Sequence, residues 1–151
     1  MKPARRAVLG FALGALATVP MTGVFLLARR VALLDEVPPH KAIRSVAPDL
    51  PEPRLSVVSG FSHLLVGAIA GVVYGTILPR QLRGALSGAG FGAAVWVVGY
   101  EAVMPLATEI PPAHRDVRRR AATIFVAHLV YGATLGVSLR NADGDRKSGA
   151  T

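Results

Sequence analysis

The chain has 151 residues, of which 52% are hydrophobic and only 17% are charged, and its formal net charge is +8. A soluble domain usually carries about 25% charged residues, so the composition excludes an ordinary soluble protein. The chain has no cysteine, which excludes disulfides, thiol catalysis and iron–sulfur clusters.

Four apolar runs divide the chain. They cover residues 7–28, 55–78, 84–107 and 121–139, and each is 19 to 24 residues long. A helix of about 20 residues crosses a hydrocarbon core, and backbone in lipid must satisfy its own hydrogen bonds. The runs therefore predict four transmembrane helices. The predicted fold class is an all-α polytopic membrane bundle that forms a single domain over residues 1–139.

The first run has an alternative interpretation. A basic start, an apolar stretch and the segment ALA at 15–17 are also typical of a secretory signal peptide, and cleavage after Ala17 would leave three helices. The apolar stretch continues to Ala28, which is longer than a usual signal peptide core, and this favours a retained helix.

Two segments outside the runs have predictable structure. After Pro38 and Pro39, apolar residues at helical spacing predict a short interfacial helix over about residues 39–47. The polar tail, residues 140–151, is predicted to be disordered.

An internal repeat is indicated by features that recur in the same order. HLLVGAIAGV at 63–72 matches HLVYGATLGV at 128–137 in six of ten positions, and a Glu-apolar-Pro-Pro segment precedes each. Aligning Gly10 with Gly88 extends the match to the preceding helices. The order predicts a tandem pair of helical hairpins with pseudo-twofold symmetry along the membrane normal.

Three ionisable side chains lie inside the apolar runs. The predicted spans put His63 and His128 about 10–12 Å below one interface and Glu101 about 9 Å below it. Each histidine begins a series of glycines spaced by four, so it shares their face of the helix. Glycine faces let helices approach closely, and intramembrane ionisable groups face the bundle interior. The three residues are therefore predicted to form one intramembrane cluster.

Three roles for this cluster remain open. The histidines form hydrogen bonds across the bundle, which is a common role of intramembrane polar groups. Alternatively, His63 and His128 are the axial ligands of haem b, which imidazole suits. In the third role His63, His128 and Glu101 form a metal site or proton relay.

The function predicted from these features is that of a small structural or accessory subunit of a membrane complex, and a non-enzymatic role is favoured over an enzymatic one. The predicted partners are the lipid bilayer and either further copies of the chain or a larger complex, because small-residue faces associate. The alternatives are a bis-histidine haem electron-transfer protein and a small transporter or relay. The arginines at 118–120 precede an apolar run, so they are expected to contact lipid headgroups rather than nucleic acid.

Membrane orientation is predicted from the basic residues. The two sides carry 8 and 9 Lys and Arg residues, so the count hardly distinguishes them. The short basic N-terminus favours cytoplasmic termini in an inner membrane, because the first helix tends to dominate orientation.

The pattern of Pro-Pro loops, a histidine in the second and fourth runs, Trp96 and GYEAVMP at 99–105 resembles small bacterial inner-membrane proteins classed as domains of unknown function. The resemblance covers nearly the whole chain and implies the four-helix topology, but no activity or site residue.

Overall fold

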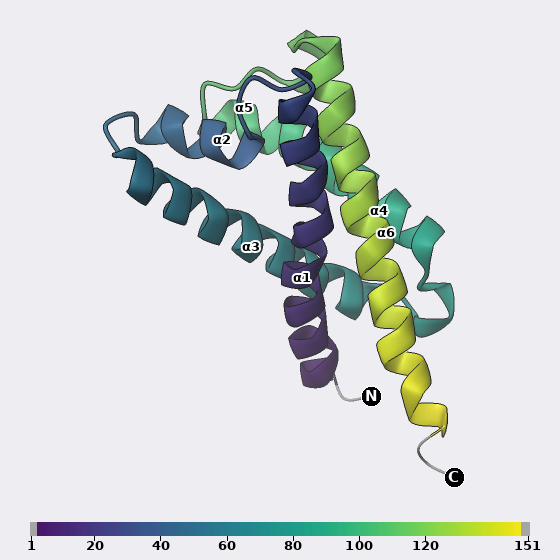
Figure 1. The fold of residues 1–151 in the computed structure, drawn as a ribbon. Helices are drawn as coiled ribbons and strands as arrows, with labels where there is room; N and C mark the ends of the chain where they lie inside the picture. Colours follow the sequence, from purple (N-terminus) through teal and green to yellow (C-terminus); the bar gives the residue numbers. More distant parts are fainter. Residues whose placement is uncertain (1–2, 149–151) are drawn as a thin grey trace.

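The structure is a computed structural model that describes residues 3–148. Its regular elements over these residues are all helical (Figure 1). The main helices are α1 (Pro3–Arg30), α2 (Pro38–Val46), α3 (Glu52–Ile77), α4 (Ala85–Val97), α5 (Met104–Ala107) and α6 (Arg118–Ser148). Shorter elements are η1 (Arg80–Leu82), the π-helix η2 (Val98–Val103) and η3 (Ala113–Arg115).

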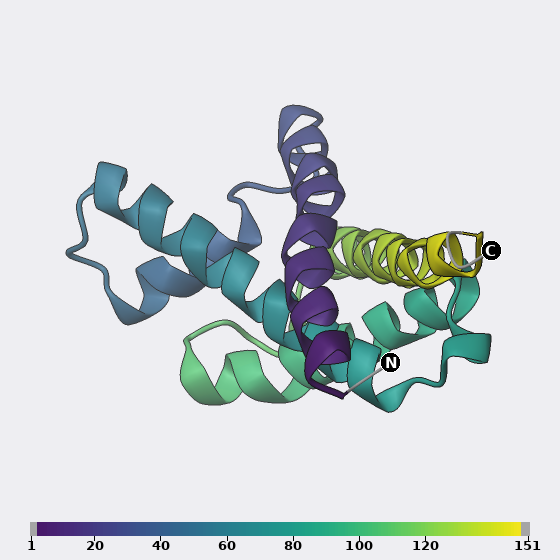
Figure 2. The same ribbon diagram turned by 90° about the horizontal axis from the view of Figure 1, so that it is seen from below.

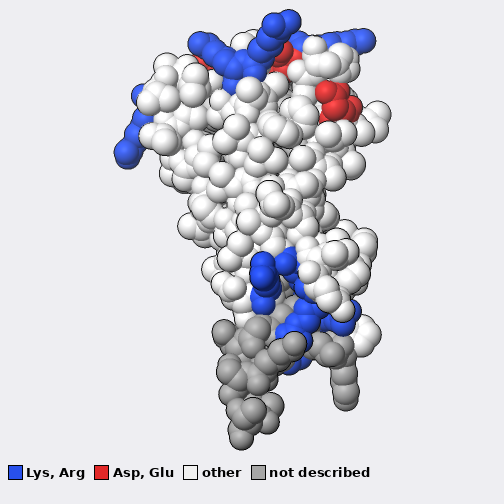
Figure 3. Space-filling view, turned by 90° about the vertical axis from the view of Figure 1, so that its right-hand side faces the viewer, with Lys and Arg blue, Asp and Glu red and all other residues white. Residues whose placement is uncertain are grey.

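Four helical segments are long and apolar enough to cross a membrane: Pro3–Arg30, Glu52–Ile77, Ala85–Ala107 and Arg118–Ala142. They confirm the predicted all-α bundle of four spanning helices. On the face seen in Figure 3, Lys and Arg gather toward both ends, Asp and Glu are visible at the upper end, and an uncharged belt lies between the two charged regions. Large apolar side chains such as Leu86 and Leu106 are about nine-tenths exposed, at 90% and 88%, as expected for side chains that face lipid.

The first hairpin pairs α1 with α3 through glycines at their crossing. A Cβ added to Gly10 would meet the carbonyl oxygen of Gly71, and one added to Gly14 would meet that of Gly67. No larger residue fits at these positions without moving backbone. The glycine faces thus allow the close approach on which helix association in lipid depends.

The second hairpin pairs α4 with α6 in the same way. A Cβ on Gly88 would meet the carbonyl oxygen of Gly132, and one on Gly136 would meet that of Gly84. In this contact Gly88 takes the place that Gly14 has in the first hairpin.

The glycines of the two hairpins that correspond in the packing differ by one helical turn from those that correspond in the sequence alignment. The alignment matched Gly10 with Gly88, whereas the packing matches Gly14 with Gly88. Residues four apart share a helix face, so glycines at this spacing fit either register. The internal duplication itself stays a prediction.

The third span is interrupted near its end. Between α4 and α5 the chain forms the π-helix η2, which is followed by Pro105. Proline has no N–H to donate to the carbonyl of Glu101 and its ring crowds that carbonyl, so a wider turn accommodates it. The predicted run 84–107 is therefore two helices joined by a π turn.

Other boundaries agree with prediction except at the C-terminus. The interfacial helix expected at about 39–47 is α2, Pro38–Val46. Helix α6 continues to Ser148, so residues 140–148 differ from the predicted disordered tail. This segment contains no proline and only one glycine, so little in it stops a helix. The remainder of the predicted tail, 149–151, lies outside the described residues.

Both chain ends lie at one end of the bundle, opposite α2 and α5 (Figure 1). Contact between the hairpins is made mainly by α1 and α6. The N-terminal part of α3 diverges from α6 toward α2 in both views (Figures 1 and 2). The hairpins are therefore close along α1 and α6 and separate on the side that α2 covers.

Candidate ligand-binding cavity

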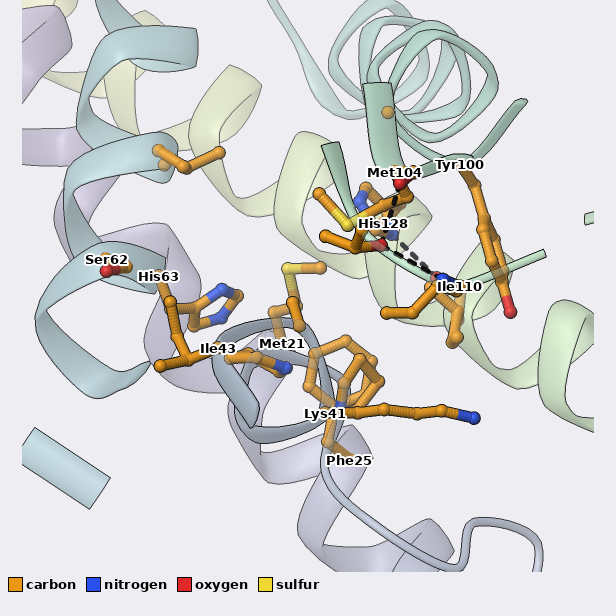
Figure 4. Close-up of a pocket in the computed structure, with 18 of the residues that line it drawn as sticks. Met21, Phe25, Lys41, Ile43, Ser62, His63, Tyr100, Met104, Ile110 and His128 are labelled. Atoms are coloured by element: carbon orange, nitrogen blue, oxygen red, sulfur yellow. Dashed lines mark hydrogen bonds between the residues drawn. The ribbon is translucent and has the colours of Figure 1, made fainter. Parts of the chain in front are cut away.

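A cavity of about 430 Å³ lies where the hairpins separate. Its lining comes from all four spanning segments and from α2 (Figure 4). Apolar side chains dominate the lining, among them Met21, Phe25, Ile43 and Met104. The volume falls in the range of about 300–1,000 Å³ that is typical of small-molecule sites.

Helix α2 covers the cavity. It begins after Val37 with two prolines, which suit the first turn of a helix. Its apolar residues Ala42, Ile43 and Val46 line the cavity. Ion pairs of 3.0 and 2.8 Å from Arg44 to Glu36 and Glu52 tie α2 to its flanking segments. These carboxylates raise the pKa of the exposed Arg44 guanidinium.

His63 lies on the wall formed by α3. Its imidazole lines the cavity (Figure 4), and its ring centroid is 6.1 Å from that of Phe25. The Nε2 atom is buried and has no hydrogen-bond partner within the described chain. Buried polar atoms without partners are rare in folded proteins, so the imidazole of His63 has hydrogen-bonding capacity that the described chain does not use.

His128 lines the same cavity from α6. Its Nδ1 is 2.8 Å from the carbonyl oxygen of Ile124. Because a carbonyl oxygen can only accept, Nδ1 carries the hydrogen in this bond. In the neutral imidazole the other nitrogen, Nε2, is then an acceptor.

Glu101 does not lie beside the two histidines. Its carboxylate accepts hydrogen bonds from the His114 side chain, with Nδ1 at 2.6 Å, and from the His114 backbone N–H at 3.1 Å. It is not part of the cavity lining, and the described residues contain no group of three His, Asp or Glu side chains that could hold a metal ion. The convergence of the three side chains was predicted from a continuous α-helix, whereas Glu101 lies within the π turn.

A polar network closes the end of the bundle near Glu101. Asp116 accepts hydrogen bonds from the Tyr100 hydroxyl, the Arg120 guanidinium and the Val117 backbone N–H. Burial raises the pKa of Asp116, but these hydrogen bonds together lower it further, so the net pKa is below the ordinary value of 3.8. Tyr100 and Arg120 also line the cavity, so the network fixes part of its wall.

The structure places both predicted histidines on one cavity, and sequence reasoning missed the cavity itself. It also missed Tyr100, which lines the cavity, and it considered Tyr131 only as a hydrogen-bond partner of the histidines. The hydroxyl of Tyr131 donates to the Gly67 carbonyl oxygen across the hairpins. The positions of these tyrosines beside glycine or histidine were only a weak signal for a cavity. Tyrosine is common wherever a side chain packs its apolar ring and finds one hydrogen-bond partner for its hydroxyl.

Four apolar helices long enough to span a membrane, around a partly open cavity, define a multi-pass α-helical membrane protein. The chain belongs to a family of unknown function, DUF6789, whose model matches residues 4–149. This confirms the resemblance to domains of unknown function. No curated protein and no solved structure matches the chain.

Proposed function

We propose that the protein binds an amphipathic small molecule, taken from the bilayer, in the cavity between its hairpins. The observation that carries the proposal is a cavity with a mainly apolar lining that has two imidazoles, those of His63 and His128, among its few polar groups. Pockets that combine an apolar lining with a few polar groups bind small molecules. A ligand with an apolar body and a hydrogen-bonding group complements this lining.

The test is analysis by mass spectrometry of small molecules extracted from protein purified in mild detergent. Ala42 lines the cavity from α2, and Ala42→Phe adds a ring that competes for the same space. Ala12 is exposed on α1 and outside the lining, so Ala12→Phe is the matched control. We expect a stoichiometric small molecule in the wild type and in Ala12→Phe, and its loss in Ala42→Phe. Equal small-molecule content in all three would contradict the proposal.

Haem b is the second candidate ligand. It is favoured by the presence of two imidazoles on one cavity, since axial histidine ligation is usual for haem. A haem site predicts a Soret absorption band in the purified protein that is lost or shifted in His63→Ala and in His128→Ala. Protein without this band after purification from haem-supplemented cells would rule out haem.

A metal site or proton relay that includes Glu101 has less support. The carboxylate already has two hydrogen bonds to His114. A relay through these groups would also need a polar path from Glu101 to the histidines. A role as a subunit of a larger complex is compatible with ligand binding, but the glycine faces expected to mediate association already pack against one another within the chain.

We further propose an inner-membrane location with both termini in the cytoplasm, which is supported by the basic N-terminus. The chain has no native cysteine, so a single introduced cysteine reports orientation directly. Asp49→Cys should react with a membrane-impermeant maleimide added to intact cells, and Asn141→Cys should react only after lysis. The reverse labelling pattern would show that the protein has the opposite orientation.

A further inference from the structure

We propose that the ligand is an isoprenoid quinol, which is a ring with two opposed oxygens and a long apolar tail. Its ring would lie between His63 and His128. The inference rests on the proposed binding function and names the ligand class. It concerns binding only and includes no electron transfer.

The position of the polar groups selects a ligand whose polar end enters the bundle. His63 and His128 are eleven and ten residues into their helices, Glu52–Ile77 and Arg118–Ser148, which is about 15–17 Å along each axis. A phospholipid keeps its headgroup at the interface, and its acyl chain has no atom that bonds to an imidazole. A prenylated ring can instead place its oxygens beside the histidines and leave its tail in apolar surroundings.

The hydrogen-bonding capacity of the two imidazoles selects the reduced ring. Nε2 of neutral His128 accepts, because Nδ1 donates to the Ile124 carbonyl oxygen. An acceptor pairs with a quinol hydroxyl and not with a quinone carbonyl. His63 lines the cavity from α3, and its ring makes no hydrogen bond within the described residues. With either tautomer a ring nitrogen is therefore left to pair with the opposite hydroxyl, which both donates and accepts.

The apolar lining suits the ring faces and the tail of the ligand. Phe25, Met21 and Met104 lie around the space between the histidines (Figure 4). Aromatic and thioether side chains pack favourably against a ring. Of the charged side chains in the lining, Glu36 and Arg120 are in ion pairs, while Lys41 lies on α2 and not on the walls that carry the histidines.

The test is titration calorimetry of the detergent-solubilised protein with a decyl-tailed benzoquinol kept reduced, and with the corresponding quinone. We expect the quinol to bind more tightly than the quinone. His63→Leu and His128→Leu should each weaken quinol binding roughly tenfold, the effect of losing about one hydrogen bond. His40 is outside the lining, so His40→Leu is the matched control and should bind as the wild type does.

Two further variants distinguish the loss of a ligand contact from misfolding. His63→Gln and His128→Gln keep a hydrogen-bonding amide and should recover part of the affinity at unchanged helical content. Tighter binding of the quinone, or equal binding in the wild type and all histidine variants, would overturn the quinol assignment. If a different lipid is then extracted from the cavity, the proposed function stands without the quinol assignment. An absence of any extracted ligand and of quinol binding would overturn both.

Discussion

Tyr131 on α6 donates a hydrogen bond of 2.7 Å to the carbonyl oxygen of Gly67 on α3, and so joins the two hairpins beside the cavity. Both residues are buried. Elsewhere the hairpins meet mainly through α1 and α6. This bond therefore holds α3 to the second hairpin on the side where the helices diverge.

Removal of this hydroxyl should weaken the bundle. We expect Tyr131→Phe to lower the free energy of unfolding by about 1 kcal/mol, which is typical of an interhelical hydrogen bond in a membrane. Thr123→Val is the control, because the Thr123 hydroxyl is exposed and bonds within α6 to the Arg119 carbonyl oxygen. Unfolding by sodium dodecyl sulfate in mixed micelles measures both. An equal loss in the two variants would show that the bond does not join the hairpins.

The glycine crossing gives a second prediction. A Cβ at Gly71 would meet backbone atoms of Gly10 and Gly14, whereas one at Gly60 or Gly23 would meet nothing within 4 Å. Gly71→Ala should therefore destabilise the protein. Gly60→Ala and Gly23→Ala should stabilise it by up to about 1 kcal/mol, since alanine favours helix over glycine.

Thermal unfolding of the three variants in detergent is the measurement. If Gly71→Ala were as stable as Gly60→Ala, the α1–α3 crossing described above would be wrong.

The network around Asp116 predicts a dependence of stability on pH. Its folded pKa lies below the ordinary value, so its ionised form is stabilised by folding. This contribution is complete above the unfolded pKa and is lost as pH falls through the folded value. We expect stability to be flat near neutral pH and to decrease below about pH 4.

Asp116→Asn should reduce stability at pH 7 by about 3 kcal/mol, as removal of one partner of a buried ion pair does. It should also flatten the decline in acid. Asp49 is exposed, and Asp49→Asn should leave both features unchanged. Chemical unfolding at pH 7 and at acid pH distinguishes the two. An acid decline that persisted in Asp116→Asn would assign it to other carboxylates.

The spanning helices could be predicted from sequence because lipid imposes length and hydropathy on each of them. The four predicted runs lie within or near the observed segments, and α2 follows the predicted amphipathic pattern. The orientation of the histidines followed from glycines four residues away, since i and i+4 share a face.

The position of Glu101 could not be predicted in the same way. A π turn adds a residue to the helix and rotates the side chains around it, and hydropathy carries no signal for such a turn. Pro105 was the only local sign of it. The cavity could not be predicted from the sequence either. It depends on the divergence of α3 from α6, and the sequence of neither helix by itself indicates that divergence.

The central claim, that His63 and His128 meet one ligand, is tested most directly by ¹⁵N NMR of the imidazoles in detergent-solubilised protein. The chain has four histidines, so His40 and His114 serve as internal controls. The account predicts that adding the cavity's ligand, first extracted and identified, shifts the imidazole nitrogen resonances of His63 and His128 and leaves those of the other two histidines unchanged. Resonances of His63 and His128 that do not respond to the ligand would contradict it.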